Sequence, residues 1–253
     1  MSDKPLLQMQ GIKLKFGEKT ILDGVDLSVQ PKEILVIMGL SGGGKSTLLS
    51  VLLRLLEPTA GKVIFKDKDL IQLHRRELNQ TRTHIGMVFQ NAALVSSMTV
   101  GENLALPLRE LSDKKPDEIE KAIKERLDLV DLADAKDKLP DELSGGMKKR
   151  VGLARALMLE PELVLFDEPS AGLDPIATER IDDLILELRD KHNVTSIVVT
   201  HEMESAFAVA SRMAFLDKGK IIFDGTPDEF KKSDNDVIKK FLESYLAHEK
   251  EKD

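Results

Sequence analysis

The sequence contains no cysteine, so disulfide bonds and thiolate metal sites are excluded. It also lacks any apolar run close to the roughly 20 residues that a helix needs to span a bilayer. One of the longest apolar runs, residues 34–40, is already interrupted by Gly39. We therefore expect no membrane-spanning subunit here, and any work at a membrane requires a partner that docks the chain there.

An excess of basic residues is missing as well. The chain has 37 Lys and Arg residues against 44 Asp and Glu residues, which gives a formal net charge of -7. A general nucleic-acid-binding protein shows the opposite balance, so nucleic acid is not an expected partner. Residues 1–5 lack the apolar core of a signal peptide, and we expect the chain to stay in the cytoplasm.

The 253 residues, 42% of them hydrophobic, are enough for one large α/β domain. Short apolar segments that predict strands alternate with segments of helical periodicity. Such alternation predicts a mostly parallel sheet with helices on both faces. The strands are expected at residues 6–16, 21–29, 34–38, 63–65, 85–89, 163–166 and 197–200.

We expect residues 1–253 to form a single domain with two additions to its α/β core. The first two strands surround a turn at Gly17 and predict an N-terminal antiparallel β subdomain. Residues 91–160 are mainly of helical pattern, which predicts an inserted α-helical subdomain. Residues 45–56 and a segment from Asp174 are further predicted helices, and residues 236–253 predict a short helical tail.

A glycine-rich segment at residues 39–46 fits the pattern G-x-x-x-x-G-K-[ST] and lies between a predicted strand and a predicted helix. Glycines let the backbone wrap closely around phosphates, and the helix start directs its amides at the same anion. Lys45 is expected to reach the β and γ phosphates of ATP, and Ser46 to bind Mg²⁺. The alternative is a glycine-rich turn with an incidental lysine. The expected nucleotide-binding residues of this loop are Gly39, Ser41, Gly42, Gly43, Gly44, Lys45, Ser46 and Thr47.

Two adjacent carboxylates, Asp167 and Glu168, end an apolar strand. Asp167 is expected to hold Mg²⁺ through a water molecule, and Glu168 to orient or deprotonate an attacking water. The alternative is a pair of solvated acids at a strand end, which is common. The glycine-rich loop upstream favours the catalytic interpretation.

A second helix start suited to anions lies at Ser144, Gly145 and Gly146. Ser144 can cap the helix, and the two glycines expose its backbone. One ATP does not need two such ends from the same chain. Two facing chains would use both, with each ATP between the glycine-rich loop of one copy and this helix start of the other.

With these motifs the chain closely resembles the ATP-binding-cassette (ABC) ATPases, which have a P-loop NTPase fold of the RecA-like type. The resemblance covers residues 6–230 and implies ATP hydrolysis with Mg²⁺. It implies that Gln90 senses the metal and the attacking water, that His201 contacts the γ phosphate, and that Phe16 stacks on adenine. Asp174 ends the loop that crosses the dimer interface in this family. The catalytic residues implied are Lys45, Gln90, Glu168 and His201, and the metal-binding residues are Ser46, Gln90 and Asp167.

Within the family, Met147 after the second helix start and the residues after Gln90 resemble the ATPases of bacterial phospholipid-transport systems of the Mla (MCE) type. This resemblance implies a second copy of the chain, integral-membrane permease subunits and an MCE-domain lipid-binding protein as partners. It also implies a place on the cytoplasmic face of the inner membrane. Leu94, Val95 and Met98 could form an apolar lip for the permease, or could be subdomain core.

Three alternatives remain at this stage. Amino-acid and methionine importers use ATPase subunits with the same motifs; the methionine type carries an extra C-terminal domain, for which we expect no room here. ABC proteins of translation or DNA repair work without a membrane, but they contain two cassettes or a long coiled coil. A nucleotide kinase would share the glycine-rich loop without needing residues 143–146.

Overall fold

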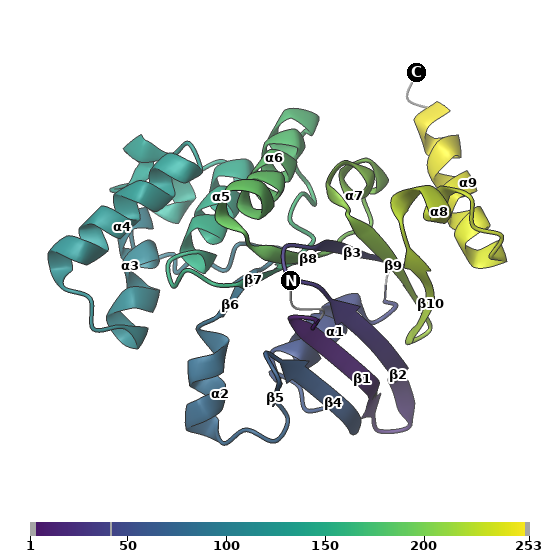
Figure 1. Ribbon diagram of the computed structural model, residues 1–253. Helices are drawn as coiled ribbons and strands as arrows, with labels where there is room; N and C mark the ends of the chain where they lie inside the picture. Colours follow the sequence, from purple (N-terminus) through teal and green to yellow (C-terminus); the bar gives the residue numbers. More distant parts are fainter. Residues whose placement is uncertain (1–3, 41, 251–253) are drawn as a thin grey trace.

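The computed structural model of the protein describes residues 4–40 and 42–250, with side chains up to Tyr245 in the last helix (Figure 1). Along the chain the elements are β1 (Leu7–Phe16), β2 (Lys19–Val29), β3 (Ile34–Met38), α1 (Lys45–Leu52), β4 (Ala60–Phe65), β5 (Lys68–Asp69), α2 (Arg75–Arg82), β6 (Ile85–Val88), α3 (Val100–Leu111), α4 (Pro116–Leu129), the 3-10 turns η1 (Ala133–Ala135) and η2 (Pro140–Glu142), α5 (Gly145–Ala156), β7 (Leu163–Asp167), α6 (Pro175–His192), β8 (Thr195–Val199), α7 (Met203–Val209), β9 (Arg212–Asp217), β10 (Lys220–Gly225), α8 (Pro227–Lys231) and α9 (Asp236–Lys250).

Two sheets organise this part of the chain. The larger sheet has the order β10-β9-β3-β8-β7-β6 and is parallel except for β10, which pairs antiparallel with β9. Every residue of β3 and of β8 is buried, because both faces of the sheet are covered. The smaller sheet, β2-β1-β4-β5, is antiparallel throughout. The predicted fold class, a mostly parallel core with an antiparallel N-terminal part, is confirmed.

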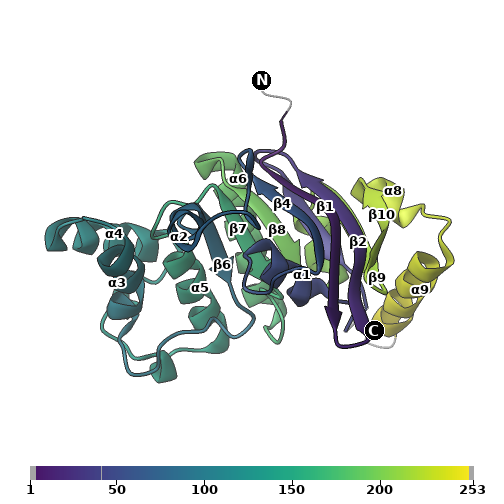
Figure 2. The same ribbon diagram turned by 90° about the horizontal axis from the view of Figure 1, so that it is seen from below.

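The faces of the larger sheet carry different helices. Alternate residues of a strand point to opposite faces. Val36 and Met38 of β3 belong to a core shared with α3 to α7, whereas Leu35 and Ile37 belong to a core shared with α1 and the smaller sheet. Figure 1 shows α5, α6 and α7 above the strands and α1 below them. Seen from below, α3 and α4 lie at one end of the molecule and α8 and α9 at the other (Figure 2).

Helix α1 is shorter than predicted and ends at Leu52 instead of Leu56. The backbone enters the left-handed region at Arg54, where φ is 51°. The Arg54 guanidinium donates to the carbonyl oxygens of Leu70 at 3.1 Å and Leu73 at 2.7 Å. This contact with a later segment stabilises the turn that stops the helix.

The helical middle of the chain begins at Val100, not near residue 91 as predicted. Ala92 and Ala93 have φ of 57° and 49°, which a right-handed helix does not allow. The guanidinium of Arg155 donates to their carbonyl oxygens at 2.8 and 2.7 Å. A contact from α5 therefore overrides the local preference of two alanines for helix. Helix α5 itself ends at Ala156, before the predicted Leu159.

In the described part of the chain, no helix has both the length and the apolar character that crossing a bilayer requires.

A buried acid joins α6 to α7. Asp182 is 7% exposed and accepts a hydrogen bond from the hydroxyl of Ser205 at 2.5 Å. Burial raises the pKa of Asp182 to about 6, the hydrogen bond from Ser205 acts against this rise, and the nearby carboxylates of Glu202 and Asp183 add to it. Ionisation of Asp182 therefore costs free energy in the folded protein.

Asp182→Asn should flatten the pH dependence of stability. Because the folded pKa lies above the ordinary value of 3.8, the stabilising contribution of Asp182 is complete at low pH and is lost as pH rises through about 6. The loss amounts to at most about 3 kcal/mol at neutral pH. We expect the asparagine variant to gain free energy of unfolding relative to the parent between about pH 4 and about pH 7.5 in urea titrations. Parallel curves for the two proteins would contradict this assignment.

Candidate active site

Four neighbouring parallel strands end at one edge of the larger sheet, and each leads into residues predicted for the site. β3 leads into the glycine-rich loop and α1, and β7 ends in Asp167. β8 is followed by Thr200 and His201, and β6 is followed by Phe89 and Gln90. Ligands of open parallel sheets bind at this carboxyl edge.

The glycine-rich loop needs glycine because the chain passes very close to a neighbouring strand. A Cβ at Gly39 would lie 2.2 Å from the carbonyl oxygen of Leu216, closer than any side chain allows. Gly44 precedes α1 with φ of 100°, a left-handed conformation that glycine adopts without strain. The loop thus turns sharply between β3 and α1 and exposes amides at the start of the helix. Ser41, a predicted phosphate ligand, lies outside the described residues.

Lys45 folds back onto the loop that precedes it. Its ammonium donates to the carbonyl oxygens of Gly39 at 2.8 Å and Leu40 at 3.3 Å, and the residue is 7% exposed. Burial lowers the pKa of Lys45, while the carboxylates of Glu168 and Asp167 act against that effect. A desolvated cation beside helix-start amides is a strong attractor for an anion such as phosphate.

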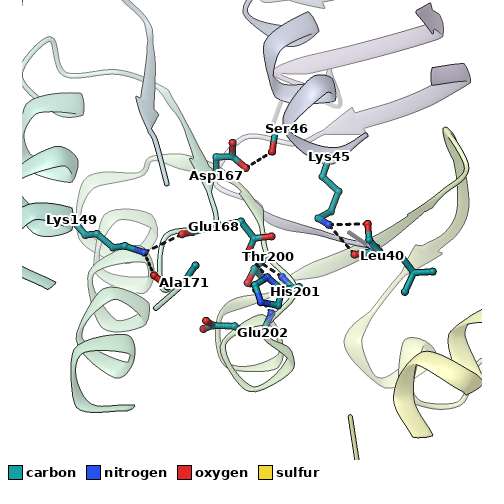
Figure 3. Close-up of polar contacts among 11 residues, drawn as sticks. Leu40, Lys45, Ser46, Lys149, Asp167, Glu168, Ala171, Thr200, His201 and Glu202 are labelled. Atoms are coloured by element: carbon teal, nitrogen blue, oxygen red, sulfur yellow. Dashed lines mark hydrogen bonds and ion pairs between the residues drawn. The ribbon is translucent and has the colours of Figure 1, made fainter. Parts of the chain in front are cut away.

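Asp167 and Ser46 meet across the site. The Ser46 hydroxyl donates to Oδ1 of Asp167 at 2.9 Å (Figure 3). Burial raises the pKa of Asp167, and the Ser46 hydrogen bond opposes that rise. Hydroxyl and carboxylate oxygens are the donors that Mg²⁺ takes. The residues present fit Mg²⁺.

Glu168 and His201 form a close pair beside these groups. Oε2 of Glu168 lies 2.7 Å from Nδ1 of His201 and accepts from the His201 backbone N–H at 3.3 Å (Figure 3). The Glu168 side chain is 13% exposed and that of His201 is 56% exposed. The histidine is the more exposed partner, so it can orient the carboxylate and still contact a substrate.

The second helix start, which the sequence analysis predicts to bind an anion, lies at the beginning of α5. Ser144 is the N-cap, and its hydroxyl accepts from the Met147 N–H at 3.3 Å. A Cβ on Gly145 would meet Leu173 at an ordinary 3.9 Å, so the backbone there is open. Because α5 and α1 pack on opposite faces of the sheet, the structure does not place the two helix starts on the same face of one chain.

Three other predicted residues stand apart from these contacts. Phe16, at the end of β1, is 53% exposed, and Gln90 is an exposed residue after β6. Asp174 caps α6, where its carboxylate accepts from the Ala177 N–H at 2.9 Å. The Phe16 ring and the Gln90 amide are both exposed and therefore free to contact a ligand.

The segment after Gln90 is held by a residue to which the sequence analysis gave no such role. Asn103 is fully buried, and its side chain accepts from the Val95 N–H at 2.8 Å and donates to the carbonyl oxygens of Val95, Met98 and Thr99. Together with Arg155 it fixes the course of residues 92–99. Leu94 packs against the core, whereas Val95 is 36% exposed, so the predicted apolar lip is only partly at the surface.

Lys149 was likewise not predicted. It reaches from α5 to the turn after β7, where it contacts backbone carbonyl oxygens of Glu168 and Ala171. The sequence signal is weak, because a lysine on a helix is ordinarily solvated.

Comparison with known proteins gives the family. A family model described as ABC transporter matches residues 22–171. The chain is similar to a solved cassette, MJ0796 bound to ADP and Pi in a dimeric post-hydrolysis state, with a TM-score of 0.80 and 32% identity, covering 87% of this chain and 98% of that one. It is also similar to cbiO1 of Clostridium perfringens, with a TM-score of 0.84 and 28% identity, covering 91% of this chain and 92% of that one.

Curated relatives carry different names for their cargo. A probable ribonucleotide transport ATP-binding protein of Mycobacterium leprae is 38% identical over 93% of this chain and 68% of its own length. A methionine import ATP-binding protein of Halalkalibacterium halodurans is 38% identical over 96% of this chain and 73% of its own. The intermembrane phospholipid transport ATP-binding protein MlaF of Haemophilus influenzae is 37% identical over 94% of this chain and 90% of its own.

The matched residues include the glycine-rich loop, the Asp167–Glu168 strand end and the start of α5. The chain belongs to the ABC transporter family and is an ATP-hydrolysing subunit of that family.

Proposed function

We propose that two copies of this chain bind two ATP molecules between them, and that their closure and reopening drive a membrane transporter. The observation that carries the proposal is the position of two phosphate-binding helix starts on opposite faces of the sheet. The phosphates of an ATP bound at the start of α1 in one copy then receive further contacts from the start of α5 in the other copy. The related bacterial ABC transporter cassette MJ0796 has a dimeric structure, which supports the pairing of two copies.

Nucleotide binding uses the exposed and charged groups of the carboxyl edge. Adenine stacks on Phe16, and Lys45 exchanges its loop carbonyls for the β and γ phosphates. Ser46, Gln90 and, through water, Asp167 would hold Mg²⁺, which would supply positive charge to the phosphate oxygens. The remaining contacts of the first copy come from the loop amides and Thr47. The second copy contributes Ser144, Gly145, Gly146 and Asp174.

Hydrolysis uses the Glu168–His201 pair. Glu168 accepts a proton from the attacking water, whose oxygen bonds to the γ phosphorus as the bond to the ADP oxygen breaks. His201 holds the carboxylate at 2.7 Å and contacts the γ phosphate. Inorganic phosphate and ADP leave, and loss of the bridging phosphates lets the two copies separate.

Coupling to a permease uses the segment after Gln90. Phe89 is 39% exposed and Val95 is 36% exposed, while Asn103 and Arg155 hold the intervening backbone in one conformation. A rigid segment with apolar side chains at the surface suits a short helix of a membrane partner. We propose that this contact holds the chain at the cytoplasmic face of the inner membrane.

We propose phospholipid as the cargo, with an MCE-domain protein as a further partner. The support is the combination of Met147 with the residues after Gln90, together with the similarity to MlaF over 94% of the chain. A specific observation favours amino-acid import as the second candidate, because a methionine import ATP-binding protein of Bacillus licheniformis is 41% identical over 92% of this chain.

Co-purification tests the cargo and the partners. The tagged chain is isolated from membranes of its own cells in mild detergent, and bound proteins and lipids are identified by mass spectrometry against an untagged control. We expect a permease, an MCE-domain protein and enriched phospholipid. A permease with a solute-binding protein and no enriched phospholipid would overturn the lipid cargo. Recovery of the chain away from membranes without any permease would overturn the transport role.

A further inference from the structure

Lys149 is a buried cation that no step above uses. It lies on α5 and is 8% exposed. Its ammonium donates to the carbonyl oxygen of Ala171 at 2.6 Å and to that of Glu168 at 3.3 Å (Figure 3). Ordering a lysine side chain in such a position costs about 2 kcal/mol of conformational entropy, and its ammonium also loses hydration. The hydrogen bonds to the two carbonyl oxygens must offset these costs.

The turn that Lys149 contacts is strained. Glu168 has φ of 50° and precedes Pro169, although a residue before proline favours extended backbone and a non-glycine residue rarely has positive φ. Such a conformation costs on the order of 1–3 kcal/mol and persists only where neighbours hold it. Three groups hold the Glu168 backbone. Its N–H donates to the Val199 carbonyl at 2.8 Å, and its carbonyl accepts from the Ala171 N–H at 3.3 Å and from the Lys149 ammonium at 3.3 Å.

The same turn aims the Glu168 side chain. With its backbone held between β8 and α5, the Glu168 carboxylate points to His201, at 2.7 Å from Nδ1. The Lys149 ammonium also lies in the field of carboxylates. Burial lowers the pKa of Lys149, and Glu202 and Glu168 act against that effect. A methionine side chain, which is of similar length, has no donor for the two carbonyl oxygens and no charge to attract these carboxylates.

We propose that Lys149 is a positioning residue for hydrolysis, which holds the strained turn after β7 so that the Glu168 carboxylate faces the attacking water. The inference rests on the proposed role of Glu168. Lys149 lies on α5, whose start at Ser144 is proposed to contact the ATP bound to the other copy. Through its contact with the turn after β7, Lys149 also connects α5 with Glu168, which acts on the ATP bound to its own copy.

Lys149→Met tests this inference, because a positioning residue should affect the rate of ATP turnover and not the binding of ATP. We expect kcat for ATP to fall by about 10- to 100-fold, as for a catalytic group displaced by about 1 Å, with KM changed less than about threefold. Turnover is expressed per molecule of bound nonhydrolysable ATP analogue, so that an unfolded fraction does not count as lost activity. Lys149→Arg should recover much of kcat, because a guanidinium can donate to both carbonyl oxygens.

The matched control is Lys148→Met, which removes the neighbouring lysine of the same helix, a residue that faces Asp141 at 3.9 Å. We expect the control to keep kcat close to that of the parent. Parent-like kcat in Lys149→Met, an equal loss in Lys148→Met, or no recovery in Lys149→Arg would each overturn the inference. The role of Glu168 is judged separately from Glu168→Gln. If that variant loses turnover while Lys149→Met does not, the inference fails and the proposed function stands.

Discussion

Glu168→Gln should lower ATP turnover by about 10²- to 10⁴-fold while ATP still binds. Glutamine keeps the size of the side chain and can still contact Nδ1 of His201, but it cannot accept a proton from water. Binding should persist, because Lys45 and the glycine-rich loop are unchanged. Steady-state release of phosphate and equilibrium binding of ATP measure the two effects.

Glu125→Gln is the control for this substitution. It makes the same chemical change on α4, where the Glu125 side chain is 55% exposed, and should leave turnover as it is. Normal turnover in Glu168→Gln would remove Glu168 from the mechanism. Loss of ATP binding in that variant would instead assign the carboxylate to ligand binding.

Lys45→Ala should weaken ATP binding by about 100-fold. A charge-assisted hydrogen bond in a desolvated site contributes up to about 3 kcal/mol, which corresponds to this change in Kd. Alanine cannot replace the cation, and the carbonyl oxygens of Gly39 and Leu40 would lose their donor as well. Isothermal titration with ATP, or fluorescence of a labelled analogue, measures the effect.

Lys62→Ala, on the exposed side of β4, removes one lysine without touching the loop and is the control for Lys45→Ala. A thermal melt of each variant separates lost affinity from lost folding. Unchanged ATP affinity in well-folded Lys45→Ala would contradict the assignment of the glycine-rich loop.

The sequence predicts the parallel core well because its signals are local. Residues 34–38 are a short apolar run followed by glycines, and the structure has β3 at those residues with all five side chains buried. Residues 163–166 are another short apolar run. Asp167 is the last residue of β7, and Glu168 follows it. Strand ends that follow this pattern meet at one edge of the sheet, which brings the predicted carboxylates, Lys45 and His201 close together.

Other parts depend on contacts that the sequence does not reveal. Helix α2 has one large buried apolar residue, Leu78, among charged and polar neighbours, so no apolar stripe predicts it. Residues 92 and 93 are alanines, which favour helix, and the hydrogen bonds from the distant Arg155 guanidinium accompany their positive φ. Lys149 reaches a turn far along the chain, and neither spacing nor periodicity indicates which helical lysine points inward.

Sedimentation of Glu168→Gln with saturating ATP and Mg²⁺ tests most directly whether two copies share the ATP sites, because it measures whether the chain dimerises around ATP. The double variant Glu168→Gln with Gly145→Asp is the comparison, since a side chain at Gly145 meets no tight contact within the chain and changes the helix start offered to the other copy. We predict that Glu168→Gln sediments as a dimer with two bound ATP, and that the double variant binds ATP but stays a monomer. ATP-saturated Glu168→Gln that sediments as a monomer would contradict the account.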